Sequence, residues 1–136
     1  MKKVSNNFSI SGPIDDAAIE ALKAQGVTKF VNVRPDNEEE DQASAEKLAI
    51  KVRSHGLEYV HLPVKPNCYS EEDIAEFVKQ LAVGDGKVHA FCRTGNRAIH
   101  LWALANANSE TLKYIEKQCE KSECNISAVK ELMQDI

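Results

Sequence analysis

Cys92 and the loop that follows it are the part of the sequence best suited to chemistry. The β-prone run Val88–Phe91 leads into the cysteine, a polar stretch Arg93–Arg97 follows, and from Ala98 the pattern becomes helical. We therefore expect the loop to wrap the N-terminus of a helix, where unpaired amides and the helix dipole favour an anion. The same field lowers the pKa of a thiol, which predicts that Cys92 is a thiolate nucleophile.

The other residues of this loop are suited to holding the anion. Gly95 lets the backbone take a positive φ or approach a ligand closely. Arg97 offers a planar fork that matches two oxygens of a phosphate or sulfate, and Arg93 adds a second charge at the rim. We interpret the loop as an anion cradle with a built-in nucleophile, formed by Arg93, Thr94, Gly95, Asn96, Arg97 and Ala98.

Composition limits the classes of function that fit this chain. With 136 residues, 43% of them hydrophobic, the sequence is the size of a single domain spanning residues 1–136. The net charge of -4 argues against a nucleic-acid partner bound by a diffuse basic face. No apolar run approaches the ~20 residues that cross a bilayer. We expect a soluble, cytoplasmic protein without membrane contact, although a leader cleaved before this numbering would leave no trace.

The remaining cysteines and histidines predict no further chemistry. Four scattered cysteines are too few to indicate a disulfide framework, and no Cys-x-x-Cys pair is present. Cys119 shares a helical face with Leu112 and Ile115, so we expect it in the core. No metal site is expected, because these histidines have no ligand-like spacing: His55, His61 and His100.

Helical and strand-like segments alternate, which favours an α/β fold with a mainly parallel sheet flanked by helices. The patterns predict strands over 27–33, 57–64 and 88–91, and helices over 12–26, 42–56, 70–81, 98–107, 109–119 and 126–133. Ser70 and Asp73 have the spacing of a capping box. We expect the acidic run 36–41 to be a solvated loop. The inward-facing residues of the two central helices should be Ala45, Leu48, Ala49, Val52, Ile74, Phe77, Val78 and Leu81.

The stretch "VHAFCRTGNRA" resembles the active-site loop of the cysteine-dependent protein tyrosine and dual-specificity phosphatases. With "GLEYVHLPV" and the segments upstream, residues 8–105 resemble the bacterial phosphatase-like family named beta-lactamase-hydrolase-like. The resemblance implies a three-layer phosphatase-type α/β fold without a metal or cofactor, and a phosphorylated or otherwise anionic substrate. It also implies that Cys92 attacks phosphorus, that Arg97 and the loop amides hold the oxygens, and that water hydrolyses a cysteinyl-phosphate.

The sequence departs from the family pattern around the loop. Four residues separate Cys92 from Arg97, where the family usually has five, and Ala98 replaces the usual serine or threonine. Phe91 stands where a histidine is usual, with His89 two positions further back. We expect His89 to serve packing or a backbone hydrogen bond rather than to tune the thiolate.

The general acid of the family is usually an aspartate on the loop after the preceding strand. Here that region reads "PVKPNCYSEED", with Lys65 and Pro66 where the acid is expected. Asp73 is the nearest aspartate, but its capping-box spacing gives it a structural role. Asp36, just past a strand end, is a second candidate.

Two other functions use the same residues. The span "CRTGNR" also resembles the loop of rhodanese sulfurtransferases, in which a cysteine carries a persulfide and no general acid is needed. A non-catalytic anion-binding module would also show an altered loop and no clear acid. The oligomeric state and the natural substrate are not indicated by the sequence.

Overall fold

The computed structural model describes residues 1–82, 86–107, 112–130 and 133. Within these residues, five strands form one sheet in the order β1-β2-β5-β3-β4. Along the chain they are β1 (Lys2–Ser5), β2 (Phe8–Ser11), β3 (Val27–Asn32), β4 (Glu58–His61) and β5 (Lys87–Phe91). β1 runs antiparallel to β2, and the other neighbouring pairs are parallel. The mainly parallel sheet confirms the predicted fold class.

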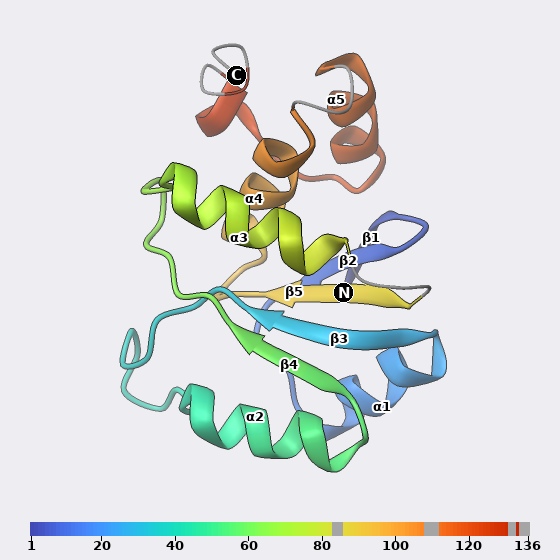
Figure 1. Cartoon of the computed structure of the whole chain (residues 1–136), viewed down its shortest axis with the longest axis vertical. Helices are drawn as coiled ribbons and strands as arrows, with labels where there is room; N and C mark the ends of the chain where they lie inside the picture. The colour runs from blue at the N-terminus through green and yellow to red at the C-terminus, as the bar shows by residue number, and fades with distance from the viewer. Residues whose placement is uncertain (83–85, 108–111, 131–132, 134–136) are drawn as a thin grey trace.

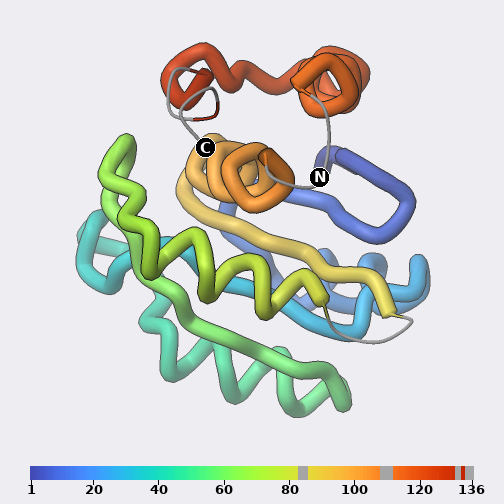
Figure 2. Tube along the Cα trace, turned by 45° about the horizontal axis from the view of Figure 1, so that its top comes forward, coloured from blue at the N-terminus to red at the C-terminus, as the bar shows by residue number. Residues whose placement is uncertain are grey.

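Helices cover both faces of this sheet (Figure 1). One face carries α1 (Asp16–Ala24) and α2 (Ala45–Ser54), and the other carries α3 (Glu71–Leu81) and α4 (Asn96–Asn106). Figure 2 shows α5 (Leu112–Lys121) and the 3-10 turn Ser127–Val129 lying beyond α4, and α5 also reaches the edge strand β1, where Gln118 Nε2 donates to the Val4 carbonyl at 3.2 Å. The three predicted layers are therefore present, with further helical segments outside α4.

Each face of the sheet has its own hydrophobic core. Phe30 and Val52 are fully buried on the side of α1 and α2, and Phe77 and Ile99 on the side of α3 and α4. In α2 the predicted inward residues are all buried: Ala45, Leu48, Ala49 and Val52. In α3 the same prediction is wrong for Val78, which is 42% exposed.

Local polar residues fix the helix starts. The Asp15 carboxylate accepts the Ala18 amide at 2.8 Å, so α1 begins after Pro13 rather than at it. The Ser70 hydroxyl accepts the Asp73 amide at 3.0 Å, and the Asp73 carboxylate accepts the Ser70 amide at 3.2 Å. This reciprocal pair confirms the predicted capping box.

The ends of the chain differ most from the expectations. The β1–β2 hairpin was not predicted, because each strand is only four residues long, which is too short for alternation to be a reliable signal. Of the helix predicted over 126–133, the structure shows the 3-10 turn Ser127–Val129, after which Lys130 and Met133 are helical, whereas residues 131–132 lie outside the described part. Residues 109–111 of the predicted helix 109–119 lie outside the described residues.

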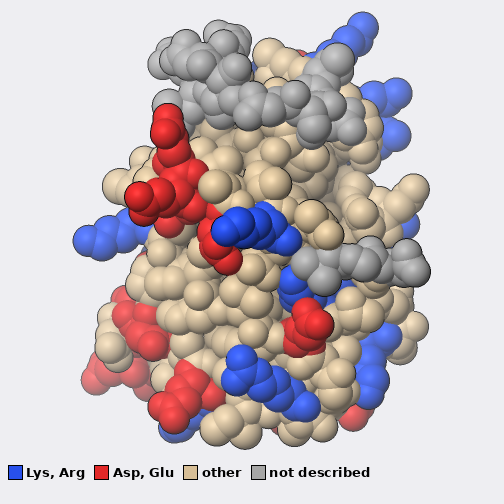
Figure 3. All heavy atoms as spheres, viewed as in Figure 1, with Lys and Arg blue, Asp and Glu red and all other residues tan. Residues whose placement is uncertain are grey.

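Acidic and basic side chains are interspersed over the face drawn in Figure 3. This view offers no continuous basic stripe of the kind that tracks a phosphate backbone. Of the helices that the structure describes, none has both the length and the apolar character needed to span a bilayer.

Candidate active site

Cys92 follows the last residue of β5, at the carboxyl edge of the parallel strands, where α/β proteins place their sites. Its amide donates to the carbonyl of Ser11 at 3.3 Å, which ties the loop to the end of β2. The side chain is fully buried, and its Sγ accepts the Gly95 amide at 3.0 Å. The positive end of the Gly95 N–H dipole therefore points at the sulfur.

The loop leaves several backbone amides at the start of α4 without a partner in the described part of the chain. Gly95 adopts a φ of 93° and is the N-cap of α4, which confirms the positive φ anticipated for it. The Asn96 amide donates to the Thr94 hydroxyl at 3.3 Å. Among the described residues, no group accepts from the amides of Arg93, Thr94 or Arg97. These donors at the start of α4 are available to an anion.

Arg97 lies buried beside the loop with part of its guanidinium engaged. Its Nη1 donates to Glu38 at 2.8 Å and to the Val64 carbonyl at 3.0 Å, and its Nη2 donates to Glu38 at 2.9 Å. A guanidinium has five N–H donors, so three are used here. Within the described part of the chain, nothing accepts from the Nε edge of Arg97. That edge keeps the paired geometry that binds two oxygens of an anion.

Glu38 is the carboxylate that organises the arginines. Besides Arg97 it accepts Arg34 Nε at 2.9 Å. The hydrogen bonds from Arg97 chiefly lower the pKa of Glu38, against the effect of burial, and Arg34 lowers it further. Burial opposes the charge of Arg97, but its hydrogen bonds to Glu38, together with its electrostatic interactions with Cys92, Glu38 and Tyr69, outweigh burial and raise its pKa. The pair is therefore ionised throughout the neutral range.

The position of Glu38 corrects one prediction. We expected residues 36–41 to be a solvated loop, yet the Glu38 side chain is only 22% exposed and joins the site. Glu39 also takes part, since its carboxylate lies 3.2 Å from Arg34 Nη2 and 3.1 Å from Arg93 Nε. Several acidic residues follow one another here, and the sequence does not indicate which of their side chains point inward. The roles of Glu38 and Glu39 could therefore not be predicted.

The two candidate general acids both hold helix starts. Asp36 Oδ1 accepts the Ala45 amide at 2.7 Å at the beginning of α2. Asp73 is engaged in the capping box of α3. Neither carboxylate has a described contact with Cys92 or Arg97, so the structure does not bring these aspartates to the loop.

Tyr69 and His100 lie near the loop and were not singled out from the sequence. The His100 Nε2–H donates to the Asn125 carbonyl at 3.2 Å, so its Nδ1 accepts the Tyr69 hydroxyl, at 2.8 Å. Burial raises the pKa of Tyr69, whose hydroxyl also interacts electrostatically with Cys92 and Arg97. Tyr69 precedes α3, in the segment where the family's general acid was expected.

His89 is buried between two serine hydroxyls rather than bonded to the backbone. Its Nδ1 lies 2.7 Å from Ser9 Oγ and its Nε2 2.8 Å from Ser11 Oγ. Because Ser11 Oγ donates to the Gly12 carbonyl, the proton of His89 belongs on Nε2. Burial lowers the pKa of His89 to about 3, so the ring is neutral. It braces the end of β2, to which Cys92 is bonded.

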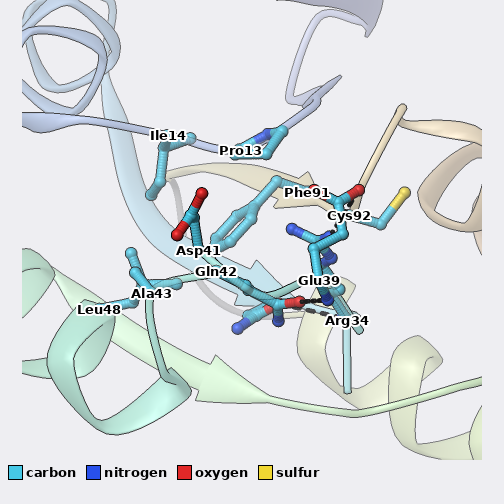
Figure 4. Close-up of a pocket in the computed structure, with 11 residues that line it drawn as sticks. Pro13, Ile14, Arg34, Glu39, Asp41, Gln42, Ala43, Leu48, Phe91 and Cys92 are labelled. Atoms are coloured by element: carbon cyan, nitrogen blue, oxygen red, sulfur yellow. Dashed lines mark hydrogen bonds and ion pairs between the residues drawn. The ribbon is translucent and has the colours of Figure 1, made fainter. Parts of the chain in front are cut away.

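A cavity of about 270 Å³ adjoins the loop on the side of α1 and α2. Its walls include Pro13, Ile14 and Phe91 (Figure 4). Cys92 borders the cavity with its main chain, whereas its sulfur points away from it. The cavity and the thiol therefore lie on different sides of the Cys92 backbone.

The cysteines outside the loop lie in different environments. Cys119 is buried in the core as expected, and burial raises its pKa to about 12. Cys68 is an exposed free thiol. In the described part of the chain, no group of three or more His, Cys, Asp or Glu side chains could hold a metal ion.

Solved structures with the same fold include proteins described as phosphatases or candidate phosphatases. A candidate phosphatase from Neisseria meningitidis Z2491 superposes with a TM-score of 0.81 at 25% identity, covering 98% of this chain and 96% of that one. Tk-PTP in its active form gives a TM-score of 0.75 at 17% identity, covering 99% and 97% of the two chains. A cysteine-to-serine variant of TpbA from P. aeruginosa, in complex with pTyr, gives 0.62 at 11%, covering 97% and 88%.

Sequence relatives lead to the same family. The beta-lactamase hydrolase-like protein of Agrobacterium fabrum is 31% identical over 105 residues, which are 77% of this chain and 24% of that protein. The protein of the same name from Xylella fastidiosa Temecula1 is 29% identical over 110 residues, or 81% and 26% of the two chains. This chain thus spans about a quarter of their length. The family model "Beta-lactamase hydrolase-like protein, phosphatase-like domain" matches residues 1–109, and the chain belongs to that family.

Proposed function

We propose that this chain is a phosphatase that hydrolyses phosphate esters through a cysteinyl-phosphate on Cys92. The observation that carries the proposal is the 3.0 Å hydrogen bond from the Gly95 amide to Cys92 Sγ, at the mouth of a loop with free amides. The electrostatic interaction of Cys92 with Arg97 supports a shared site for nucleophile and anion. The phosphatase fold of the structural relatives supports the same class of reaction.

In the first step the Cys92 thiolate attacks phosphorus. A sulfur–phosphorus bond forms while the bond from phosphorus to the ester oxygen breaks, and that oxygen leaves with the electron pair. The Nε edge of Arg97 and the free amides of Arg93 and Thr94 donate to the other phosphoryl oxygens. Such fixed donors stabilise the transition state because they need no reorganisation as charge develops.

In the second step water attacks the phosphorus of the cysteinyl-phosphate. The sulfur–phosphorus bond breaks, inorganic phosphate leaves, and the thiolate of Cys92 is restored. The Gly95 amide stabilises the departing thiolate through the hydrogen bond already present. Ala98 has no hydroxyl to assist, so we expect this step to be slower than the first.

The leaving group narrows the class of substrate. Since Asp36 and Asp73 hold helix starts, we assign no carboxylic acid to protonate the departing oxygen. An ester of a weakly basic alcohol needs such protonation least, which favours aryl phosphates over alkyl phosphates. The TpbA structure in complex with pTyr contains a ligand of the aryl type. We therefore propose aryl phosphate esters as the substrates.

The test is hydrolysis of para-nitrophenyl phosphate by the wild-type chain and by single variants. Cys92→Ser should abolish turnover, and Arg97→Lys should lower kcat/KM by about 10²-fold or more. Cys68→Ser, which removes an exposed thiol, is the matched control and should leave the rate unchanged. Equal turnover by Cys92→Ser and wild type would overturn the proposal.

A second candidate function is sulfur transfer by the same loop. Asp36 and Asp73 are engaged at helix starts, which favours this reaction because it needs no general acid. The Cys92 thiolate would attack the outer sulfur of thiosulfate, releasing sulfite and forming a persulfide, and cyanide would remove that sulfur as thiocyanate. Thiocyanate formation without any phosphate release would replace the phosphatase proposal. If neither phosphate release nor thiocyanate formation is detected while the protein still binds sulfate, the chain would be an anion-binding module.

A further inference from the structure

The cavity beside the loop is lined differently from the anion cradle. It lies between the starts of α1 and α2, with Ile14, Leu48 and Phe91 among its apolar walls. Its volume of about 270 Å³ is just below the ~300 Å³ at which pockets for small molecules begin. The space therefore suits a small molecule with a single-ring body.

The cavity is separate from the place of the anion. Cys92 borders it with main-chain atoms while the sulfur points away (Figure 4), and Arg97 is not part of its lining. A molecule in the cavity would not occupy the anion's place. The two sites can thus be filled at the same time.

Charge decides which small molecule fits. Asp41 directs its carboxylate toward the space between Ile14 and Phe91 (Figure 4). None of the described residues forms an ion pair or hydrogen bond with Asp41. The positive charge at the cavity, Arg34, is already opposed by Glu38 at 2.9 Å and Glu39 at 3.2 Å, although its buried Nη2 makes no hydrogen bond within the described residues.

The charge without a partner at this cavity is therefore negative. A cation placed against Asp41 would gain from the apolar walls, because charges attract more strongly beside a region of low dielectric constant. A ring on the same molecule would remove apolar surface of Ile14, Leu48 and Phe91 from water. The carboxylate of Asp41 and the apolar walls therefore both favour a molecule that combines a positive charge with an apolar ring.

We propose that this cavity is a binding site for a small organic cation that carries an amine or amidine on an apolar ring. The cation pairs with Asp41 and the ring packs against the apolar walls. The site does not depend on the proposed reaction at Cys92. Its occupant is neither the phosphate ester nor the product phosphate.

Benzamidine is the probe that tests this site. Titrated into ¹⁵N-labelled protein, it should shift the amide resonances of Ile14, Asp41 and Phe91 in a saturable manner. Benzyl alcohol, which keeps the ring without the charge, should bind several-fold more weakly. Asp41→Asn should weaken benzamidine binding about fivefold or more, whereas Glu40→Gln, a neighbouring exposed acid outside the cavity lining, should not.

Two further variants complete the test. Ala43→Phe should fill the cavity and remove benzamidine binding, with the dispersion of the remaining resonances as the check on folding. Cys92→Ser should bind benzamidine as wild type does, which separates this test from the fate of the phosphatase proposal. Shifts absent from the cavity amides, or equal weakening by Asp41→Asn and Glu40→Gln, would overturn the inference.

Discussion

Glu38 holds the guanidinium of Arg97 with both carboxylate oxygens, at 2.8 and 2.9 Å. A two-point contact fixes the plane of the guanidinium, so its Nε edge has one orientation before any ligand arrives. The Val64 carbonyl, at 3.0 Å from Nη1, holds the same group from a second direction. An anion bound by Arg97 therefore meets a donor pair that is already positioned, which is how fixed geometry lowers a reaction barrier.

The first prediction concerns this contact. Glu38→Gln should lower kcat/KM for para-nitrophenyl phosphate by about tenfold or more, because Arg97 loses its charged partner and its fixed plane. The free energy of unfolding should fall by about 1–3 kcal/mol, less than for a fully buried pair because the Glu38 side chain is 22% exposed. Steady-state kinetics and urea unfolding measure the two effects. Glu40→Gln is the matched control, and equal kcat/KM in the two variants would contradict this role of Glu38.

The second prediction separates helix capping from proton donation at Asp36 and Asp73. An asparagine keeps a side-chain oxygen that accepts a backbone N–H but cannot donate the proton of a carboxylic acid. Asp36→Asn and Asp73→Asn should therefore retain both stability and kcat. Asp36→Ala and Asp73→Ala should lower the free energy of unfolding by about 0.5–2 kcal/mol.

Thermal unfolding and turnover of the four variants check this prediction. The decisive quantity is kcat of the asparagine variants under conditions in which they are fully folded. A large loss of kcat in either one, without loss of stability, would make that aspartate the general acid.

The third prediction compares two glycines in the left-handed region. Gly95 has φ 93° at the loop and Gly56 has φ 78° after α2, where an added Cβ would meet nothing within 4 Å. Alanine at either position should cost about 1–2 kcal/mol of stability through backbone strain. Only Gly95→Ala should also reduce turnover, because its amide donates to Cys92 Sγ. Equal kcat in both variants would show that the loop tolerates the strain without losing its geometry.

The fourth prediction is a pH dependence of stability caused by His89. Burial lowers the pKa of His89 from 6.5 to about 3 in the folded chain, so between these values the unfolded chain binds more protons. Stability from this group is complete above pH 6.5 and is lost as the pH falls toward 3. Between pH 7 and 5 the loss should be about 2 kcal/mol.

His89→Gln provides the comparison, because glutamine can bridge Ser9 and Ser11 without titrating. Urea unfolding at pH 7 and pH 5 should show a smaller loss of stability in the variant than in wild type. The lowered pKa of His100 acts in the same direction, but it is present in both proteins and cancels in the difference. Parallel losses in wild type and variant would contradict the assignment to His89.

Local patterns predicted the elements that depend on neighbouring residues. The buried stripe of α2 follows the helical period, and the Ser70–Asp73 capping box depends on a spacing of three residues, so both could be found in the sequence. The Cys92 loop is also local, since a strand, a short polar turn and a helix follow each other directly. The strands predicted over 27–33, 57–64 and 88–91 are likewise present, as β3, β4 and β5.

Long-range contacts could not be predicted in the same way. Glu38 lies 59 positions before Arg97 in the chain. The residues beside Glu38 are also acidic, so the sequence does not indicate which of them contacts Arg97. His89 finds Ser11 from 78 positions away, because β2 and β5 are adjacent in the sheet. The strand order that creates this contact is set by packing of the whole sheet, and single-sequence patterns contain little information about it.

The most direct test of the cysteinyl-phosphate mechanism is to trap the phosphoryl group on the protein. The chain would be mixed with para-nitrophenyl phosphate, quenched in acid during turnover, and mapped by peptide mass spectrometry. Because Ala98 offers no hydroxyl to the departing thiolate, we expect the intermediate to accumulate, with one phosphoryl group on the peptide that contains Cys92. Phosphate release without a label on Cys92, or with the label on another residue, would contradict this mechanism.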